Sequence, residues 1–177
     1  RVGVTGAVEK TGAADQKLYG ADVLVRKSEQ TFADAEVAVS RGPGFGNSAS
    51  ADGGLTISDT ATSGMSGNSA TAYRLHGQVG LGDITGDRFD GEAGAYFEKK
   101  QAGFSSLDEQ VSVTKRVWGV EGRVAVGENS QAHVRFEDLR SDDGKAATEL
   151  NADVMVAVTG NLTLTPACIS TAAPAPS

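Results

Sequence analysis

The sequence predicts an all-β protein, an antiparallel up-and-down meander of about eight or nine strands that forms a transmembrane β-barrel or an open portion of a larger one. Three observations favour this fold class. Apolar and polar residues alternate along most of the chain, and no segment has a convincing stripe of apolar residues at helical spacing. The connections between these runs are alternately long and short along the chain.

The clearest alternation lies between Arg116 and Asp138, and it predicts a β-hairpin. Its apolar positions are Trp118, Val120, Val124 and Val126, followed by Ala132, Val134 and Phe136. Charged or polar residues stand between them, and successive side chains of a strand point to opposite faces. The turn formers of residues 127–130 separate the two runs. If residues 126–130 form the connection, Ala125 lies opposite Gln131, Glu121 opposite Arg135 and Arg123 opposite His133.

The same criteria predict the other strands, and no helix beyond a turn or two. We expect strands near residues 2–9, 18–27, 32–41, 72–82, 89–100, 111–126, 131–140 and 147–159, with a short one at 161–166. Most of these runs approach the roughly 9–11 residues that a tilted strand needs to cross a bilayer.

The connections predict how the strands are arranged. Those at 42–71, 101–110 and 141–146 should lie at one end of the meander, and the short connections SEQ, GDITGDR and GENS at the other. We interpret residues 1–166 as a β-barrel segment, residues 42–71 as a long mobile loop, and residues 167–177 as a disordered tail rich in Pro and Ala.

Each strand is expected to have one wholly apolar face and one charged face. A soluble β-sandwich would show the same alternation, with the apolar face turned to a core. The apolar positions are mostly Val, Ala and Gly, which would make a thin core but suffice against lipid tails. In a barrel the charged face points inward, because Lys or Arg at the bilayer midplane costs about 2–4 kcal/mol. The predicted lumen-facing polar residues are Arg74, His76, Glu121, Arg123, His133, Arg135 and Glu137.

Composition and motifs exclude several functions. A net charge of -7 argues against a nucleic-acid partner, and the single Cys168 cannot form an intrachain disulfide. His76 and His133 lack metal-ligand spacing, and no G-x-S-x-G motif occurs. We therefore predict no catalytic residues, no metal and no cofactor. The start at Arg1, with neither Met nor signal-peptide features, indicates a processed chain or a fragment of a longer one.

Three segments resemble the transmembrane barrel of large bacterial outer-membrane surface proteins, some of which carry repeat or OmpA-like domains. They are LYGADVLVRKSEQTFADAEVAVSRG, AYFEKKQAGFSS and RVWGVEGRVAVGENSQAHVRFED. The resemblance implies the outer membrane of a Gram-negative bacterium, with membrane lipid as partner and small solutes or other domains of a larger chain as candidate partners. The expected role is membrane anchoring, surface display or a passive, porin-like pore without enzymatic activity. The alternative is a soluble extracellular β-sandwich or adhesin-like binding module.

Overall fold

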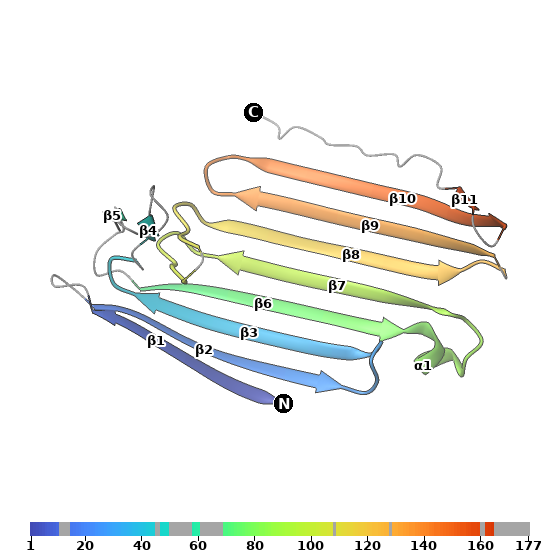
Figure 1. Cartoon of the computed structure of the whole chain (residues 1–177), viewed down its shortest axis with the longest axis horizontal. Coiled ribbons are helices and arrows are strands. Elements are labelled where there is room, and N and C mark those ends of the chain that lie inside the picture. The colour runs from blue at the N-terminus through green and yellow to red at the C-terminus, as the bar shows by residue number, and fades with distance from the viewer. Residues whose placement is uncertain are drawn as a thin grey trace.

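The computed structural model describes residues 1–10, 15–44, 47–49, 58–60, 69–107, 109–127, 129–159 and 162–164. They form one antiparallel sheet in which strands that follow one another along the chain lie side by side, in the order β1-β2-β3-β6-β7-β8-β9-β10-β11 (Figure 1). Its strands are β1 (Val2–Lys10), β2 (Asp15–Arg26), β3 (Phe32–Arg41), β6 (Ser69–Gly80), β7 (Gly91–Lys100), β8 (Lys115–Ala125), β9 (Ser130–Ser141), β10 (Ala146–Thr159) and β11 (Leu162–Leu164). A separate two-stranded ribbon pairs β4 (Asn47–Ala49) with β5 (Ser58–Thr60).

The structure confirms the predicted all-β, antiparallel up-and-down meander and corrects some boundaries. β8 begins at Lys115 rather than at residue 111, because Val111 is buried within the connection before it. Leu81 and Gly82, expected at the end of a strand, belong to the short helix α1 (Leu81–Thr85). The pairing of β4 with β5 inside the predicted loop 42–71 was not expected. The mobility predicted for most of that loop, and the disorder predicted for residues 167–177, concern residues outside those described.

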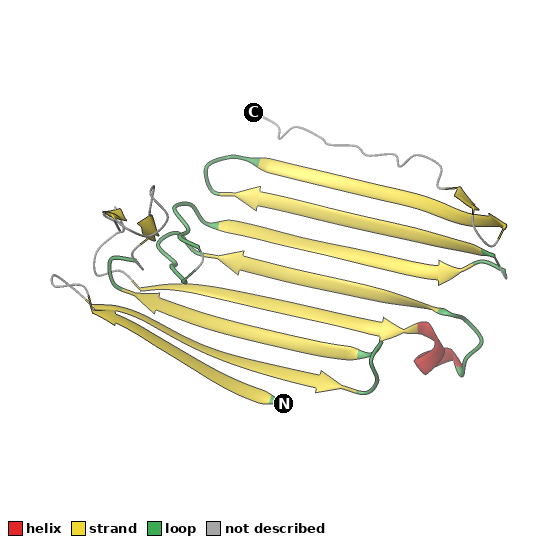
Figure 2. Cartoon of the chain, in the orientation of Figure 1, coloured by secondary structure: helices red, strands yellow, loops and turns green. Residues whose placement is uncertain are grey.

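The long and short connections separate as predicted. The connections β3–β6, β7–β8 and β9–β10 lie at one end of the sheet (Figure 1), which we call the loop end. The connections β2–β3, β6–β7 and β8–β9 lie at the other, which we call the turn end; α1 is part of it (Figure 2). This separation follows from the unbroken antiparallel order of the strands.

The predicted register of the β8–β9 hairpin is also confirmed. Ala125 pairs with Gln131, and Arg123 pairs with His133. Glu121 pairs with Arg135, so Glu121, Arg123, His133 and Arg135 lie on one face of the hairpin.

The sheet is open in the part of the chain that the structure describes. There β1 pairs only with β2, while β10 pairs with β9 and the short β11. β1 and β10 lie on opposite sides of the sheet (Figure 1), and this arrangement is compatible with an open portion of a barrel. No helix among the described residues is long and apolar enough to span a membrane.

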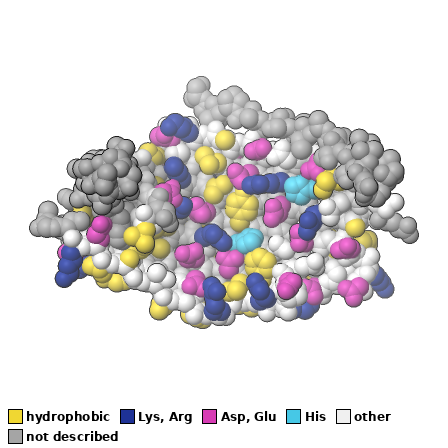
Figure 3. Space-filling model, in the orientation of Figure 1, with side chains coloured by type: hydrophobic (Ala, Val, Ile, Leu, Met, Phe, Trp, Pro, Cys, Tyr) yellow, Lys and Arg dark blue, Asp and Glu magenta, His cyan; other side chains and the backbone are white. Residues whose placement is uncertain are grey.

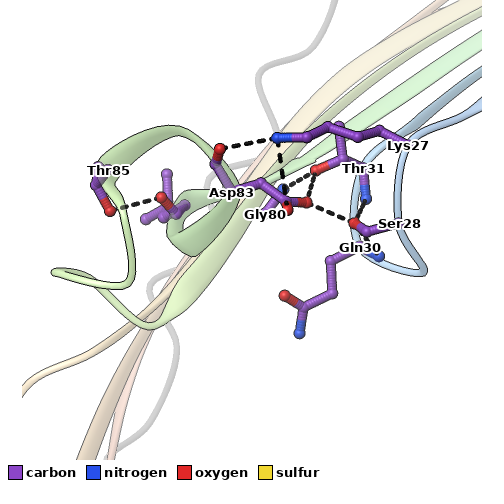
Figure 4. A network of polar contacts seen from close by, with 8 residues as sticks. Lys27, Ser28, Gln30, Thr31, Gly80, Asp83 and Thr85 are labelled. Carbon is purple, nitrogen blue, oxygen red and sulfur yellow. Dashed lines mark hydrogen bonds and ion pairs between the residues drawn. The ribbon is translucent and has the colours of Figure 1, made fainter.

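A polar network fastens α1 to the turn between β2 and β3 (Figure 4). The Asp83 carboxylate accepts hydrogen bonds from Ser28 Oγ, at 2.5 Å, and from Thr31 Oγ1, while Lys27 Nζ donates to the Asp83 carbonyl at 2.9 Å. Thr31 Oγ1 also accepts a bond from Gly80 N at 3.0 Å. The Ser28 and Thr31 hydroxyls keep the pKa of Asp83 below its ordinary value. This contribution to stability is therefore present at neutral pH and is lost only as the pH falls through that lowered pKa.

Replacing Thr31 by Val should loosen this end of the sheet. The substitution removes the hydroxyl that joins Asp83 to Gly80, so we expect the free energy of unfolding to fall by about 1–2 kcal/mol, measured by urea titration. Thr5→Val, at an exposed position of β1, is the matched control and should change stability by less than about 0.5 kcal/mol. Equal losses in the two variants would show that the network does not stabilise the turn.

Candidate functional site

One face of the sheet carries most of its large apolar side chains, and we call it the apolar face. Cross-strand partners share a face, so the register assigns it strand by strand. Its exposed large residues are Val2, Val4, Val8, Tyr19, Val23, Val25, Val37, Leu75, Trp118, Val120, Val134, Leu150, Val154 and Val156. These side chains face away from the protein rather than into a core.

No second layer covers the apolar face among the described residues. Among the helices and strands of that part of the chain, each long strand contacts only its neighbours in the sheet, and α1 contacts only β6 and β7. Leu75 is 52% exposed and Val120 is 43% exposed, although both lie in central strands. A soluble sandwich would bury such positions against a second sheet.

Aromatic side chains gather on the apolar face toward the loop end. Trp118 packs against Phe136 with ring centroids 5.1 Å apart, and Tyr73 stacks on Phe97 at 5.9 Å. Tyr19 of β2 lies on the same face. In the sequence these residues are scattered, and the pairing of the strands brings them together.

The opposite face, which we call the polar face, carries all the predicted lumen-facing residues, and charged side chains crowd one side of the molecule in Figure 3. The register places Arg74, His76, Glu121, Arg123, His133, Arg135 and Glu137 on this face.

Most of these side chains are engaged in ion pairs or hydrogen bonds across the strands. Arg74 and His76 both approach Asp34, at 3.6 and 3.1 Å. His133 Nδ1 lies 3.0 Å from Asp153 Oδ1. Each histidine is thus joined to a carboxylate on a neighbouring strand.

The register places both arginines on the polar face, as predicted, but neither side chain binds the residue opposite it in the β8–β9 hairpin. Arg123 donates at 2.7 Å to Glu92 Oε1, and Glu92 is its register partner on the other neighbouring strand, β7. Arg135 donates to Glu137 at 2.9 Å, not to Glu121. A long guanidinium side chain reaches several positions on its face, so the nearest carboxylate decides the pair.

Sequence reasoning missed Tyr96, which spans two strand spacings on the polar face. Its ring lies over Gly119 of β8, and its hydroxyl donates to Glu137 of β9. A Cβ at Gly119 would stand 2.7 Å from atoms of that ring. The glycine at a polar-face position of a strand was the available signal, since such a gap often marks a close approach by a neighbouring group.

The connection between β7 and β8 folds back over the polar face, which was also not anticipated. Phe104 and Val111 are buried with Ala70 and Ala72 of β6, and they form the only buried apolar cluster of the described residues. Ser105 N donates to Ser40 Oγ at 3.0 Å in the same buried region. The small protein core therefore lies beneath this connection, on the charged side of the sheet.

The polar face offers ion pairing and hydrogen bonding. In the part of the chain that the structure describes, no three side chains of His, Cys, Asp or Glu come together as metal ligands. Comparisons with protein-family models, curated proteins and solved structures found no match.

The contact of Tyr96 with Gly119 can be tested by adding one methyl group. Gly119→Ala should displace the Tyr96 ring and weaken its bond to Glu137, which we expect to lower the free energy of unfolding by about 1–3 kcal/mol. Gly122→Ala is the matched control on the same strand, because the nearest atom to its new Cβ would be 3.9 Å away. Urea titration of both variants measures the difference, and an unchanged Gly119→Ala variant would contradict the close packing.

Proposed function

We propose that this chain forms part of the wall of a bacterial outer-membrane β-barrel, with its apolar face against lipid and its polar face toward a water-filled interior. The role is non-enzymatic, as a membrane anchor or surface-display segment, with passive passage of small solutes where a closed barrel forms. The observation that carries this proposal is the exposed apolar face, which has no covering layer among the described residues. The bacterial outer membrane enters the proposal through the sequence resemblance.

The dimensions of the strands support a membrane location. The eight long strands have between 9 and 14 residues, enough to cross the hydrocarbon layer at a tilt. On β8 the apolar positions run from Trp118 to Val124, a distance of about 20 Å along the strand. Outer-membrane barrels present an apolar band about 25 Å tall, bordered by aromatic residues. The aromatic residues near the loop end fit such a border.

The polar face supports an interior that holds water. Its arginines and histidines pair with carboxylates on the same face, so their charges are compensated there. Lipid therefore does not have to accommodate any of these groups as an isolated charge. The folded connection around Phe104 and Val111 covers part of this face near the loop end. In a closed barrel the same connection would narrow the interior.

The soluble binding module remains the competing function, and it requires protein rather than lipid to cover the apolar face. Such a module needs a second sheet or a partner protein over Leu75, Val120 and Val134, which are exposed here. A detergent-free preparation that stays monomeric and monodisperse would favour it over the membrane proposal.

Trp118 is the only tryptophan of the chain, so its fluorescence reports directly on the apolar face. After refolding into lipid vesicles we expect brominated acyl chains to quench the emission and aqueous acrylamide to leave most of it unaffected. The reason is that a lipid-facing indole contacts the acyl chains and is shielded from water. Strong acrylamide quenching with no effect of the brominated lipid would overturn the membrane proposal.

A charge on the apolar face should impair insertion, whereas the same charge one residue further along should not. Leu75→Arg places a guanidinium near the middle of β6 on the apolar face, and we expect insertion to become less favourable by about 2–4 kcal/mol. His76→Arg is the control, because its side chain stays on the polar face beside Asp34. Partitioning of each variant between vesicles and urea solution gives the comparison, and equal partitioning would contradict the assigned faces.

A further inference from the structure

The loop end of the apolar face carries a row of positive charge. Lys99 of β7 pairs in register with Arg116 of β8, and Arg116 pairs with Arg140 of β9. We call these three residues the cationic row. The prediction that each strand has a wholly apolar face is therefore wrong at this end, because the row and Asp138 lie on the face of Trp118 and Phe136.

The cationic row places like charges directly opposite one another, whereas cross-strand pairs of charged residues usually combine opposite charges. Side chains that are direct partners on one face lie about 4.5–5.5 Å apart at their Cβ atoms, and like charges there repel. On the polar face Arg74, Arg123 and Arg135 each bind a carboxylate. In the cationic row only Arg140 has such a partner among the described residues, so Lys99 and Arg116 are left without a counter-ion from the chain in that part of it.

The one carboxylate beside the row is already engaged. Asp138 is 6% exposed, and it accepts bonds from Arg140 Nε and from Thr148 Oγ1, both at 3.1 Å. The bond from Arg140 uses Nε, so the two terminal guanidinium nitrogens can bind another anion. A second pair of cations, Lys17 and Arg41, lies opposite one another at the same end and on the same face.

The charge is confined to one border of the apolar face. From the loop end toward the turn end, β8 presents Arg116, then Trp118, then Val120 and Val124. β7 repeats this order with Lys99, Phe97 and Ala95. The turn-end positions of the central strands, such as Val79, Ala93 and Val124, are uncharged. Along each of these strands a cation is thus followed by an aromatic ring and then by an aliphatic or small side chain. The order matches that of a membrane leaflet, in which the headgroup is followed by the interface and then by the acyl chains.

From this geometry we infer that the cationic row binds the anionic phosphate headgroups of the membrane leaflet at the loop end. The inference rests on the proposed function, since the row meets headgroups only if the apolar face is embedded in lipid. Phosphate oxygens match the guanidinium fork of Arg116 and Arg140 and supply the negative charge that the row lacks. The consequence is a preference for anionic lipid and a fixed depth of the sheet in the bilayer.

The test compares two double variants of equal charge on the same two strands. Lys99→Gln with Arg116→Gln neutralises two residues of the row. Lys100→Gln with Lys115→Gln neutralises the next pair in register, which lies on the polar face. Partitioning of the full chain is measured for phosphatidylcholine vesicles and for vesicles that also contain phosphatidylglycerol.

The unmodified chain should prefer the anionic vesicles, and each charge removed from the row should lower that preference about fivefold. The preference should weaken at high salt, and inorganic phosphate should weaken it no more than another salt of equal ionic strength. The polar-face double variant should keep the preference. Insertion into phosphatidylcholine alone shows that both double variants fold.

Three outcomes would overturn the inference. Equal partitioning into both vesicle types, with insertion intact, would remove the headgroup site and leave the proposed function standing. Specific competition by inorganic phosphate would indicate a site for a free anion instead. Failure of the unmodified chain to insert into either vesicle would remove the proposed function and the headgroup site together.

Discussion

The structure depends on one constraint, which is that a strand in a single-layered sheet presents alternate side chains to two different surroundings. The backbone hydrogen bonds are satisfied between neighbouring strands, so the side chains are free to differ between the faces. One face can then carry Val, Leu and aromatic residues, and the other can carry Arg, His and carboxylates. A shift by one residue in any strand would place its charges among the apolar residues, and this cost fixes the register.

The two faces of the sheet are stabilised in different ways. On the polar face, ion pairs and the Tyr96–Glu137 bond link strands, and the connection around Phe104 supplies the small buried cluster. The apolar face has few contacts of its own beyond the packing of two pairs of aromatic rings. Its large residues are exposed, so most of its stabilisation must come from whatever covers it. Lipid is the cover that the proposed function supplies, and a partner layer is the cover that the soluble alternative requires.

The two ends of the sheet also differ, and this difference gives the molecule a direction. The turn end is closed by α1 and the Asp83 network, whereas the loop end carries the cationic row and the folded connection. In a membrane these ends would meet different leaflets. Charge and aromatic residues at the loop end would set how deeply the sheet lies.

The sequence by itself determined the all-β class, the order of the long strands, the separation of the connections and the register of β8 with β9. It did so because each of these follows from local alternation and turn residues. It also placed Arg74, His76 and the charged residues of β8 and β9 on one face. Only the tertiary structure decided which carboxylate Arg123 and Arg135 bind, that Tyr96 crosses Gly119, that Phe104 and Val111 fold over the polar face, and that Lys99, Arg116 and Arg140 form a row. Apart from the Arg135–Glu137 pair, these features join residues that are distant along the chain. They depend on the lateral order of the strands and the reach of long side chains, and no local pattern encodes either.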